Sequence, residues 1–194
     1  MFVVALGAGL RIGEILALRW ADVDLTKNEI IVSASVSRSK DRESSGIATK
    51  SSIKTGSPKT KNSYRSIPLT YEVKQAMLRH REEQATERLR AGSAWVRNDL
   101  VFCNTLGGFL ECRNVARLFA EYRNAAEVSK LPFHSLRHSF ATNSIAAGVD
   151  YYYLSRILGH SSISLTLDTY TDYLPDKASH EMSKMEGALS LKFA

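Results

Sequence analysis

The sequence predicts a mainly α-helical domain that carries one small antiparallel β-sheet, an α+β fold. Apolar residues recur at helical spacing through most of the chain beyond residue 114. Residues 29–36 alternate and are rich in β-branched side chains, as strands are, and residues 64–69 supply a second, closing strand. The chain has 194 residues, of which 44% are hydrophobic, enough for one domain with a buried core.

The first third of the chain is expected to form a helix followed by a long hairpin. Residues 2–18 carry apolar side chains at helical spacing among several glycines, and the helical pattern is clearest after Gly9. Residues 20–24 end this helix, and the strand at 29–36 follows. Residues 37–63 are rich in Ser, Lys and Gly and have little to bury, so they predict a long hairpin or loop. The apolar pattern begins without a cap, which suggests that the first helix is cut short.

Helices dominate the rest of the chain. Thr70 is a suitable N-cap for a helix over residues 71–90. A short strand at 100–103 and a turn at residues 107–108 are expected next. Further helices are predicted over residues 114–128, 135–147, 151–158, 162–170 and 176–189. Asp150 and Gly148 fit the cap positions between two of them.

The positive charge of the chain is concentrated in one segment. The formal net charge is +6, with a pI near 9.4. Between residues 31 and 69 two acidic residues face eight basic ones: Arg38, Lys40, Arg42, Lys50, Lys54, Lys59, Lys61 and Arg65. This segment therefore carries the whole excess charge, which favours a surface that docks on phosphate groups over a merely solvated face.

Several classes of protein are disfavoured. Cys103 and Cys112 match no disulfide or metal spacing, so a reducing cytoplasm is the expected location. No run is long and apolar enough to span a membrane, and no basic segment precedes the apolar start as it would in a signal peptide.

Two short motifs imitate cofactor and metal sites. The glycines of residues 7–13 resemble a dinucleotide-binding turn, but that turn needs alternating β-α-β units, which this pattern does not offer. His134 and His138 could share a helix face and ligate zinc, yet no third ligand has supporting spacing and Arg137 between them would repel a cation. No cofactor and no metal are therefore expected.

Four segments together resemble the tyrosine recombinases, the phage integrase family. Residues 9–14 and 18–24 read GLRIGE and LRWADVD, and residues 58–69 read PKTKNSYRSIPL. Residues 134–139 read HSLRHS, and LGHS at residues 158–161 precedes Tyr170. Each segment alone is weak, but the four occur in the family's order and approximate spacing over nearly the whole chain. The long basic hairpin looks closest to integrases of temperate phages and conjugative elements.

The resemblance implies the catalytic domain of a site-specific recombinase, with the fold of the DNA breaking-rejoining enzymes. Residues 1–194 would form this single domain, without the family's N-terminal core-binding and arm-binding domains. Double-stranded DNA would be the partner. Self-association into a tetramer on DNA would use the last helix, at residues 176–189.

The resemblance also implies roles for individual residues. Tyr170 would attack a DNA phosphodiester to form a 3′-phosphotyrosine, and religation would need neither ATP nor metal. Arg11 and Arg137 would grip the non-bridging oxygens, because a guanidinium fits two of them at once. The remaining assignments are His134 as proton acceptor, His160 as phosphate donor and Lys59 as the acid that protonates the leaving 5′-hydroxyl. Lys61 is the alternative acid, Tyr173 the alternative nucleophile, and Glu14 and His138 have supporting roles.

Further basic residues are expected to contact the DNA backbone: Arg38, Lys40, Lys54, Lys61, Arg65, Arg113 and Arg117. One departure from the family pattern is Asp172, where a histidine is common.

Two alternative functions stay open, a type IB topoisomerase-like relaxing enzyme and a non-catalytic DNA-binding module. We expect Arg11, His134, Arg137 and His160 to converge on one basic cleft, with Lys59 and Tyr170 displaced in the absence of DNA.

Overall fold

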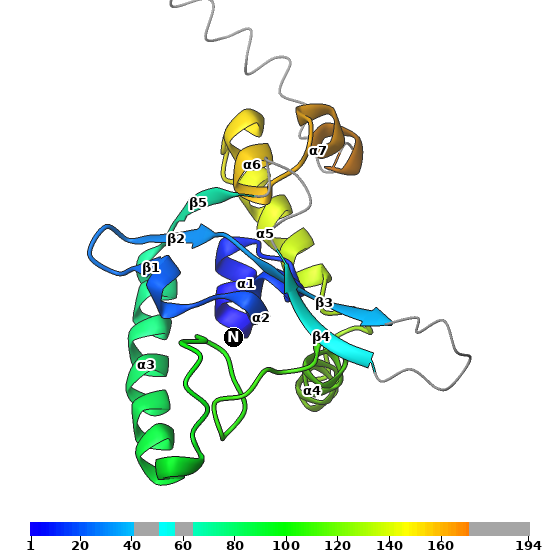
Figure 1. The fold of residues 1–194 in the computed structure, drawn as a ribbon. Coiled ribbons are helices and arrows are strands. Elements are labelled where there is room, and N and C mark those ends of the chain that lie inside the picture. Colours follow the sequence, from blue (N-terminus) through cyan, green and yellow to red (C-terminus); the bar gives the residue numbers. More distant parts are fainter. Residues whose placement is uncertain (41–50, 57–63, 171–194) are drawn as a thin grey trace, which may run out of the picture.

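The computed structural model describes residues 1–40, 51–56 and 64–170, and confirms a mostly helical fold with small antiparallel sheets (Figure 1). The helices are α1 (Phe2–Ala8), α2 (Ile12–Ala17), α3 (Tyr71–Ala91), α4 (Cys112–Ala125), α5 (Ser135–Ala146), α6 (Tyr151–Leu158) and α7 (Ile163–Tyr170). The strands are β1 (Val23–Asp24), β2 (Glu29–Val32), β3 (Ser35–Lys40), β4 (Ser51–Gly56) and β5 (Arg65–Pro68). None of the described helices is long and apolar enough to cross a lipid bilayer.

The strands form two antiparallel sheets. One has the order β1-β2-β5, and its register places Val32 opposite Arg65. The other is the hairpin of β3 and β4, which pairs Ser35 with Gly56. The single strand expected at 29–36 is thus two strands, because the chain leaves the first sheet at Ser33 and Ala34 and enters the second. β3 and β4 extend beyond the body of the molecule in Figure 1.

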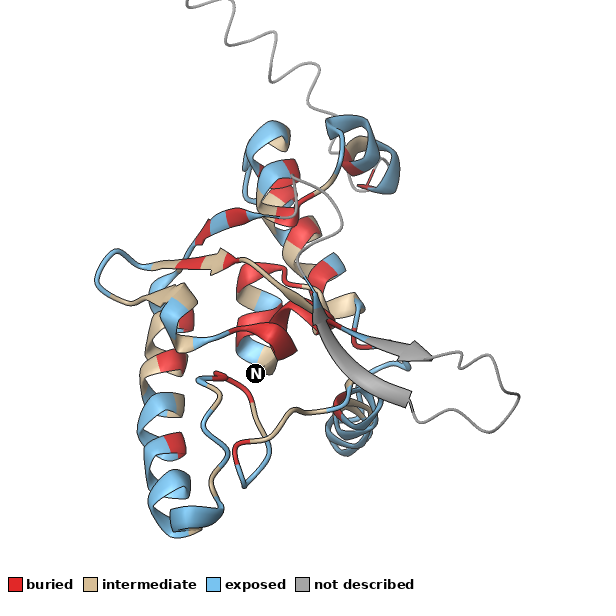
Figure 2. Ribbon diagram, in the orientation of Figure 1, coloured by how far each residue is buried: buried red, intermediate tan, exposed pale blue. Residues whose placement is uncertain are grey.

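The buried core centres on α1 and α2 (Figure 2). Residues of these helices pack against α3, the three-stranded sheet and the segment at 100–102. A smaller cluster joins α5, α6 and α7 through Ala141, Ile145, Leu154, Leu158 and Tyr170. The two clusters meet where α5 crosses α1.

The helix expected over residues 2–18 is broken in the middle. Gly9 ends α1 in the left-handed conformation, with φ of 62°, and Arg11 is extended and stands at the N-cap of α2. Glu14 accepts a hydrogen bond of 2.9 Å from the backbone N–H of Arg11, which satisfies one of the free donors at the start of α2. The break therefore places Arg11 in a turn instead of along a helix.

The strand expected at 100–103 is wrong. Only Leu100 forms an isolated antiparallel bridge, to Arg19. The side chain of Gln84 on α3 donates to the carbonyls of Leu100 and Val101 at 3.0 and 2.9 Å. Because this buried amide takes the place of a neighbouring strand, Leu100, Val101 and Phe102 are buried without a ladder of strand hydrogen bonds.

Candidate active site

Two arginines far apart in the sequence meet at the C-terminal end of α6. Arg137 on α5 is 3% exposed, and its guanidinium donates to the carbonyls of Gly9 at 2.8 Å and Leu158 at 2.6 Å. Arg11 lies in the turn after α1, and its Nη2 donates to the carbonyl of Gly159 at 3.4 Å. The structure thus brings Arg11 and Arg137 to neighbouring carbonyls, while the Arg11 side chain keeps 39% exposure to solvent.

A buried carboxylate supports this pair. Glu14 accepts from Nη1 of Arg11 at 2.9 Å and from Nη1 and Nη2 of Arg65 at 3.2 and 2.9 Å. Burial acts to raise the pKa of Glu14, but the hydrogen bonds and charges of Arg65 and Arg11 outweigh it and hold the pKa below its ordinary value. Glu14 is therefore ionised at neutral pH and braces both arginines.

Arg65 differs from its expected role as an exposed contact to DNA. It is buried, with 8% exposure, and β5 alternates so that Arg65 and Ile67 face inward. The sequence contains a signal for this buried position. Ile67 stands two residues after Arg65, and side chains two residues apart on a strand lie on the same face. We name Arg11, Arg65 and Arg137 the arginine cluster.

The arginine cluster carries more positive charge than Glu14 balances. Burial, together with the charges of Arg11 and Arg65, lowers the pKa of Arg137 to about 9, although the charge of Glu14 opposes the shift. Arg137 remains protonated at pH 7 even so. Such an excess of buried cationic charge is stabilised when an anion binds, and planar guanidinium groups suit phosphate oxygens.

His160 follows directly on this end of α6. Gly159 turns the chain with φ of 65°, and Nδ1 of His160 lies 2.8 Å from Oγ1 of the buried Thr166. Burial, followed by the charges of Arg137 and the rest of the arginine cluster, lowers the pKa of His160 to about 4. The imidazole is consequently neutral at pH 7.

Tyr170 ends α7 with its side chain turned inward. It is 2% exposed, and its hydroxyl lies 3.2 Å from Nδ1 of His138 on α5. The ring centroids of His138 and His134 lie 4.8 Å apart, so the three aromatic rings form a row. Burial raises the pKa of Tyr170, and the charge of Arg137 partly offsets this. The contact between His138 and Tyr170 joins residues that no sequence pattern had linked.

His134 stands at the start of α5 and is exposed. Burial of part of its ring lowers its pKa, and the positive charges of His138, Arg137 and Arg11 add to the effect. Within the described residues, no three His, Cys, Asp or Glu side chains gather as a metal site would require.

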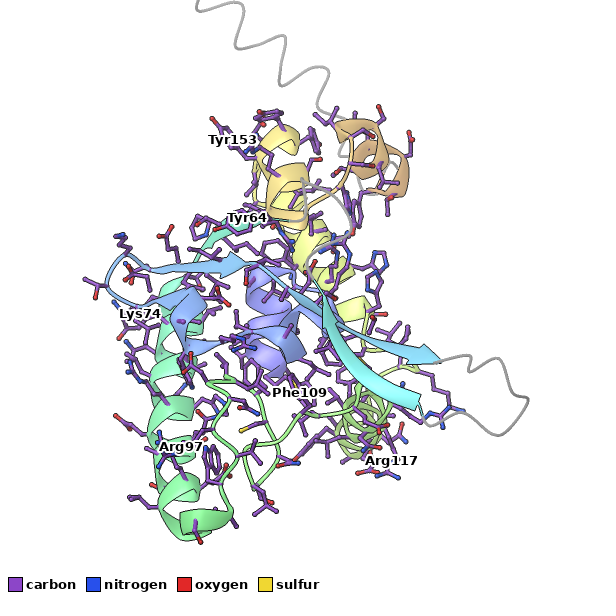
Figure 3. All side chains as sticks on the ribbon, in the orientation of Figure 1. Tyr64, Lys74, Arg97, Phe109, Arg117 and Tyr153 are labelled. Atoms are coloured by element: carbon purple, nitrogen blue, oxygen red, sulfur yellow. The ribbon has the colours of Figure 1, made fainter. Side chains whose placement is uncertain are left out.

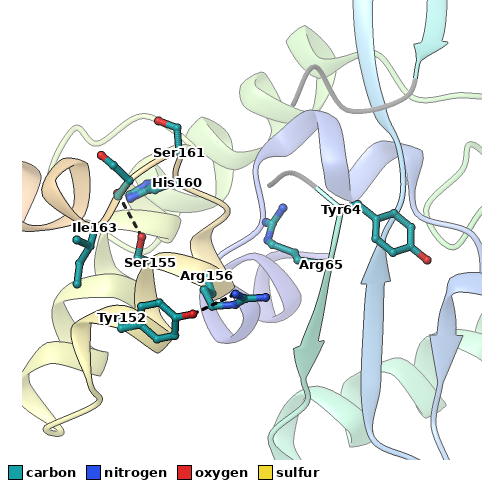
Figure 4. A pocket seen from close by; sticks show the side chains of 9 residues that line it. Tyr64, Arg65, Tyr152, Ser155, Arg156, His160, Ser161 and Ile163 are labelled. Carbon is teal, nitrogen blue, oxygen red and sulfur yellow. Dashed lines mark hydrogen bonds between the residues drawn. The ribbon is translucent and has the colours of Figure 1, made fainter. Parts of the chain in front are cut away.

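A cavity of about 310 Å³ opens beside His160 (Figure 4). Tyr64 and Arg65 line it from the start of β5, and Tyr152, Arg156 and His160 line it from α6 and the turn that follows. The Arg156 guanidinium donates to the Tyr152 hydroxyl at 3.2 Å. The cavity therefore has cationic and hydrogen-bonding walls on both sides.

The other expected site residues lie away from the arginine cluster or outside the residues that the structure describes. Lys59, Lys61, Tyr173 and the helix expected at 176–189 lie outside the described residues. Arg38 and Lys40 stand on β3 and Lys54 on β4, and their side chains lie outside the description too. Arg113 and Arg117 are exposed on α4, and Figure 3 shows Arg117 well apart from Tyr64 and Tyr153.

Comparison with known proteins gives a consistent result. The family model described as Phage integrase family matches residues 1–176. A tyrosine recombinase XerC-like protein of Caldanaerobacter subterraneus is 33% identical over 189 residues, which cover 95% of this chain and 48% of that protein. An integrase of Streptomyces ambofaciens is 31% identical over 172 residues, 87% of this chain and 42% of the relative. The chain thus spans about half the length of the curated relatives that it matches.

Solved structures resemble the fold. The integrase of transposon Tn1549, solved in complex with transposon right end DNA, superposes with a TM-score of 0.73 at 27% identity, covering 95% of this chain and 57% of that one. A crystal structure of XerA recombinase superposes with a TM-score of 0.62 at 24% identity, covering 95% and 56% of the two chains, and supports the fold alone.

Proposed function

Because the chain belongs to the phage integrase family, we propose that it is the catalytic domain of a site-specific DNA recombinase. The observation that carries the proposal is the arginine cluster beside His160, with Tyr170 in the adjoining cluster of α5, α6 and α7. Tyr170 attacks a DNA phosphodiester, the tyrosyl oxygen bonds to phosphorus, and the bond to the 5′-oxygen breaks. The resulting 3′-phosphotyrosine keeps the bond energy for religation.

Arg11 and Arg137 stabilise the charge that builds up on the non-bridging oxygens. The chemistry of phosphoryl transfer depends mostly on positioning and on charge stabilisation. The solvent-exposed guanidinium of Arg11 and the polar edge of His160 support this role, since both can reach an incoming phosphate. Loss of one well-placed donor typically lowers such rates by about 10²–10³-fold.

Two histidines are available for the proton of Tyr170. We keep His134 as the acceptor during attack, since its lowered pKa leaves a neutral imidazole at pH 7. In the structure the hydroxyl of Tyr170 lies within hydrogen-bonding distance of Nδ1 of His138. Attack thus exchanges this contact for one with the scissile phosphate. Lys59, or Lys61 as the alternative, protonates the leaving 5′-hydroxyl.

The proposed partner is double-stranded DNA, and a relative of the same fold was solved with DNA. The phosphate contacts we propose outside the catalytic centre are Arg38, Lys40, Lys54, Lys61, Arg113 and Arg117. Assembly into a tetramer on DNA would use residues 176–189, and the protein would work in the cytoplasm.

A library of nicked suicide duplexes with randomised sequence tests the reaction. Cleavage beside the nick releases a short oligonucleotide, so religation fails and the covalent adduct accumulates on a denaturing gel. We expect adducts with the wild-type chain, enriched in one sequence, and none with Tyr170→Phe. An equal yield from both, or no adduct from the wild type, would contradict the proposal and favour a non-catalytic DNA-binding module. Relaxation of supercoils without recombination of two copies of the enriched site would indicate a topoisomerase-like enzyme.

A further inference from the structure

Three consecutive carbonyls at the C-terminal end of α6 each accept a hydrogen bond from a different member of the arginine cluster. Nε of Arg65 donates to Ile157 at 2.5 Å, Nη2 of Arg137 to Leu158 and Nη2 of Arg11 to Gly159. The last carbonyls of a helix have no partner within the helix, and the negative end of its dipole attracts cations. The cluster therefore caps α6 directly before His160.

Arg65 has a different position from the other two members. Its side chain is 6% exposed, against 39% for Arg11, so far less of it is accessible to solvent even where it lines the cavity beside His160. Its guanidinium donates inward, to both oxygens of Glu14 and to the carbonyl of Ile157. These contacts hold the Arg65 guanidinium between Glu14 and the end of α6.

Arg65 connects the turn before α2, the end of α6 and strand β5. Through Glu14 it reaches the backbone N–H and the guanidinium of Arg11. Its guanidinium also packs against the turn before His160, since a Cβ at Gly159 would lie 2.9 Å from its Nη1. Arg65 is itself the first residue of β5, opposite Val32 on β2, and stands six residues after Lys59 in the sequence.

We propose that Arg65 is a positioning residue of the catalytic site, which sets the guanidinium of Arg11 through Glu14 and fixes the end of α6 that presents His160. The inference rests on the proposed function. A buried ion pair is weak evidence for stability, because well-packed apolar residues often replace one without loss. A geometric role explains better why one carboxylate and one carbonyl are held so closely by a single planar group.

Arg65→Lys tests this role, because lysine keeps the charge but cannot span Ile157 and both oxygens of Glu14. Arg79→Lys, on the exposed face of α3, is the matched control. The rate of adduct formation is measured at saturating DNA, well below the unfolding temperature of each variant. We expect Arg65→Lys to slow cleavage about 10–100-fold with little change in DNA affinity, since small misplacements of a catalytic group have effects of this size. Arg79→Lys should match the wild type.

A second substrate distinguishes a loss of Arg11 positioning from an unspecific loss of activity in Arg65→Lys. A methylphosphonate at the scissile position replaces one charged oxygen by a methyl group, so less charge needs stabilisation by Arg11. If Arg65 acts through Arg11, the deficit of Arg65→Lys should shrink to less than about threefold on this substrate. A deficit of the same size on both substrates, or none on either, would overturn the proposal.

An NMR measurement tests the positioning role of Arg65 independently of whether the chain cleaves DNA. In a ¹H–¹⁵N NMR spectrum of the DNA-free chain, Arg65→Lys should shift the Nε signal of Arg11 and the amides of Gly159 and His160, and leave those of α4 in place. Unmoved signals would overturn the positioning role whether or not the chain cleaves DNA. Absence of wild-type adduct together with shifted signals would refute the reaction but keep the structural link.

Discussion

The hydroxyl of Tyr170 lies 3.2 Å from Nδ1 of His138, and this contact joins the end of α7 to the exposed side of α5. Tyr170 is also the member of the small buried cluster that α7 contributes, alongside Leu154 and Leu158 of α6. The proposed nucleophile thus packs its own helix, α7, against α5 and α6. The Tyr170 side chain therefore both carries the proposed reactive hydroxyl and packs α7 against α5 and α6.

The contact should be measurable as a coupling energy between the two residues. His138→Ala and Tyr170→Phe each remove one partner, and the double variant removes both. Because His138 is exposed, we expect a coupling of about 0.5–1 kcal/mol in the free energy of unfolding, the lower part of the range for hydrogen bonds. Urea denaturation of the four proteins gives this value. Strictly additive effects would show that the hydroxyl gains nothing from His138.

Replacing Glu14 should destabilise the protein strongly. Glu14→Gln leaves the buried Arg65 without its counter-charge, and breaking a buried pair in this way typically costs about 3–5 kcal/mol. Glu82→Gln on the exposed face of α3 is the control and should change little. Chemical denaturation at pH 7 measures both. A cost for Glu14→Gln as small as that of the control would mean that Arg65 finds another partner.

The same variant should change the acid limb of the stability curve. The folded pKa of Glu14 lies below its ordinary value of 4.5, so its contribution is complete above pH 4.5 and is lost as the pH falls through the folded pKa. The difference in unfolding free energy between wild type and Glu14→Gln should therefore shrink from pH 4.5 downward. A difference that stays constant to pH 3 would contradict the ionised state of Glu14.

Local patterns were sufficient for most of the fold. Caps and periodicity predicted α3, α5, α6 and the start of α7 within a residue or two, and a glycine follows α3, α5 and α6 within two residues of their ends. The segment at 100–103 failed because a side chain, Gln84, satisfies carbonyls that a neighbouring strand would satisfy in a sheet. Such a replacement depends on where α3 lies and has no local signature.

In the candidate site, too, some features could be predicted from local sequence and others depend on tertiary packing. The sequence named Arg11, Arg137 and His160 through their resemblance to the family, and the structure brings these three to the end of α6. The sequence did not lead to the prediction that Arg65 turns inward. Its lysine-rich neighbourhood favoured an exposed position, although the alternation of β5 places Arg65 on the buried face. The pair of His138 and Tyr170 depends on how α7 folds back on α5, which no local pattern specifies.

Arg113 and Arg117 on α4 should each contribute to the salt dependence of DNA binding. If both contact phosphates, changing either to Gln should flatten the slope of log affinity against log salt concentration by about one. Arg79→Gln, an exposed arginine of α3, is the control with an unchanged slope. Fluorescence anisotropy with a labelled duplex at several salt concentrations gives the slopes. Equal slopes for all variants would place the DNA away from α4.

His160 should titrate far below an ordinary histidine. Its pKa is lowered from 6.5 to about 4 by burial and by the charges of Arg137, Arg11 and Arg65. An NMR titration of its ring in the DNA-free chain should have a midpoint near 4, and its stabilising effect, complete above pH 6.5, should be lost as the pH falls toward 4. Bound DNA should raise the midpoint, because a phosphate offsets the arginines. A midpoint near 6.5 without DNA would show that the arginine cluster is not close to the ring.

Two glycines with left-handed backbones offer a matched test of the turn that presents Arg11. Gly9 has φ of 62° and Gly148 has φ of 81°, so alanine strains the backbone at both by about 1–2 kcal/mol. A Cβ at Gly9 would also overlap the ring of Phe140, whereas nothing lies within 4 Å of one at Gly148. We expect Gly148→Ala to cost only the strain, and Gly9→Ala to cost about 1–3 kcal/mol more from overpacking.

Urea denaturation of the two variants measures this difference. The carbonyl of Gly9 also accepts a hydrogen bond from Arg137, so a shift of the turn moves both ends of the proposed phosphate site. Gly9→Ala should therefore lower the rate of adduct formation at temperatures where the variant is still folded, and Gly148→Ala should not. Equal stability and equal rates for the two variants would mean that Phe140 yields freely, and that the turn at Gly9 does not determine where Arg11 and Arg137 meet.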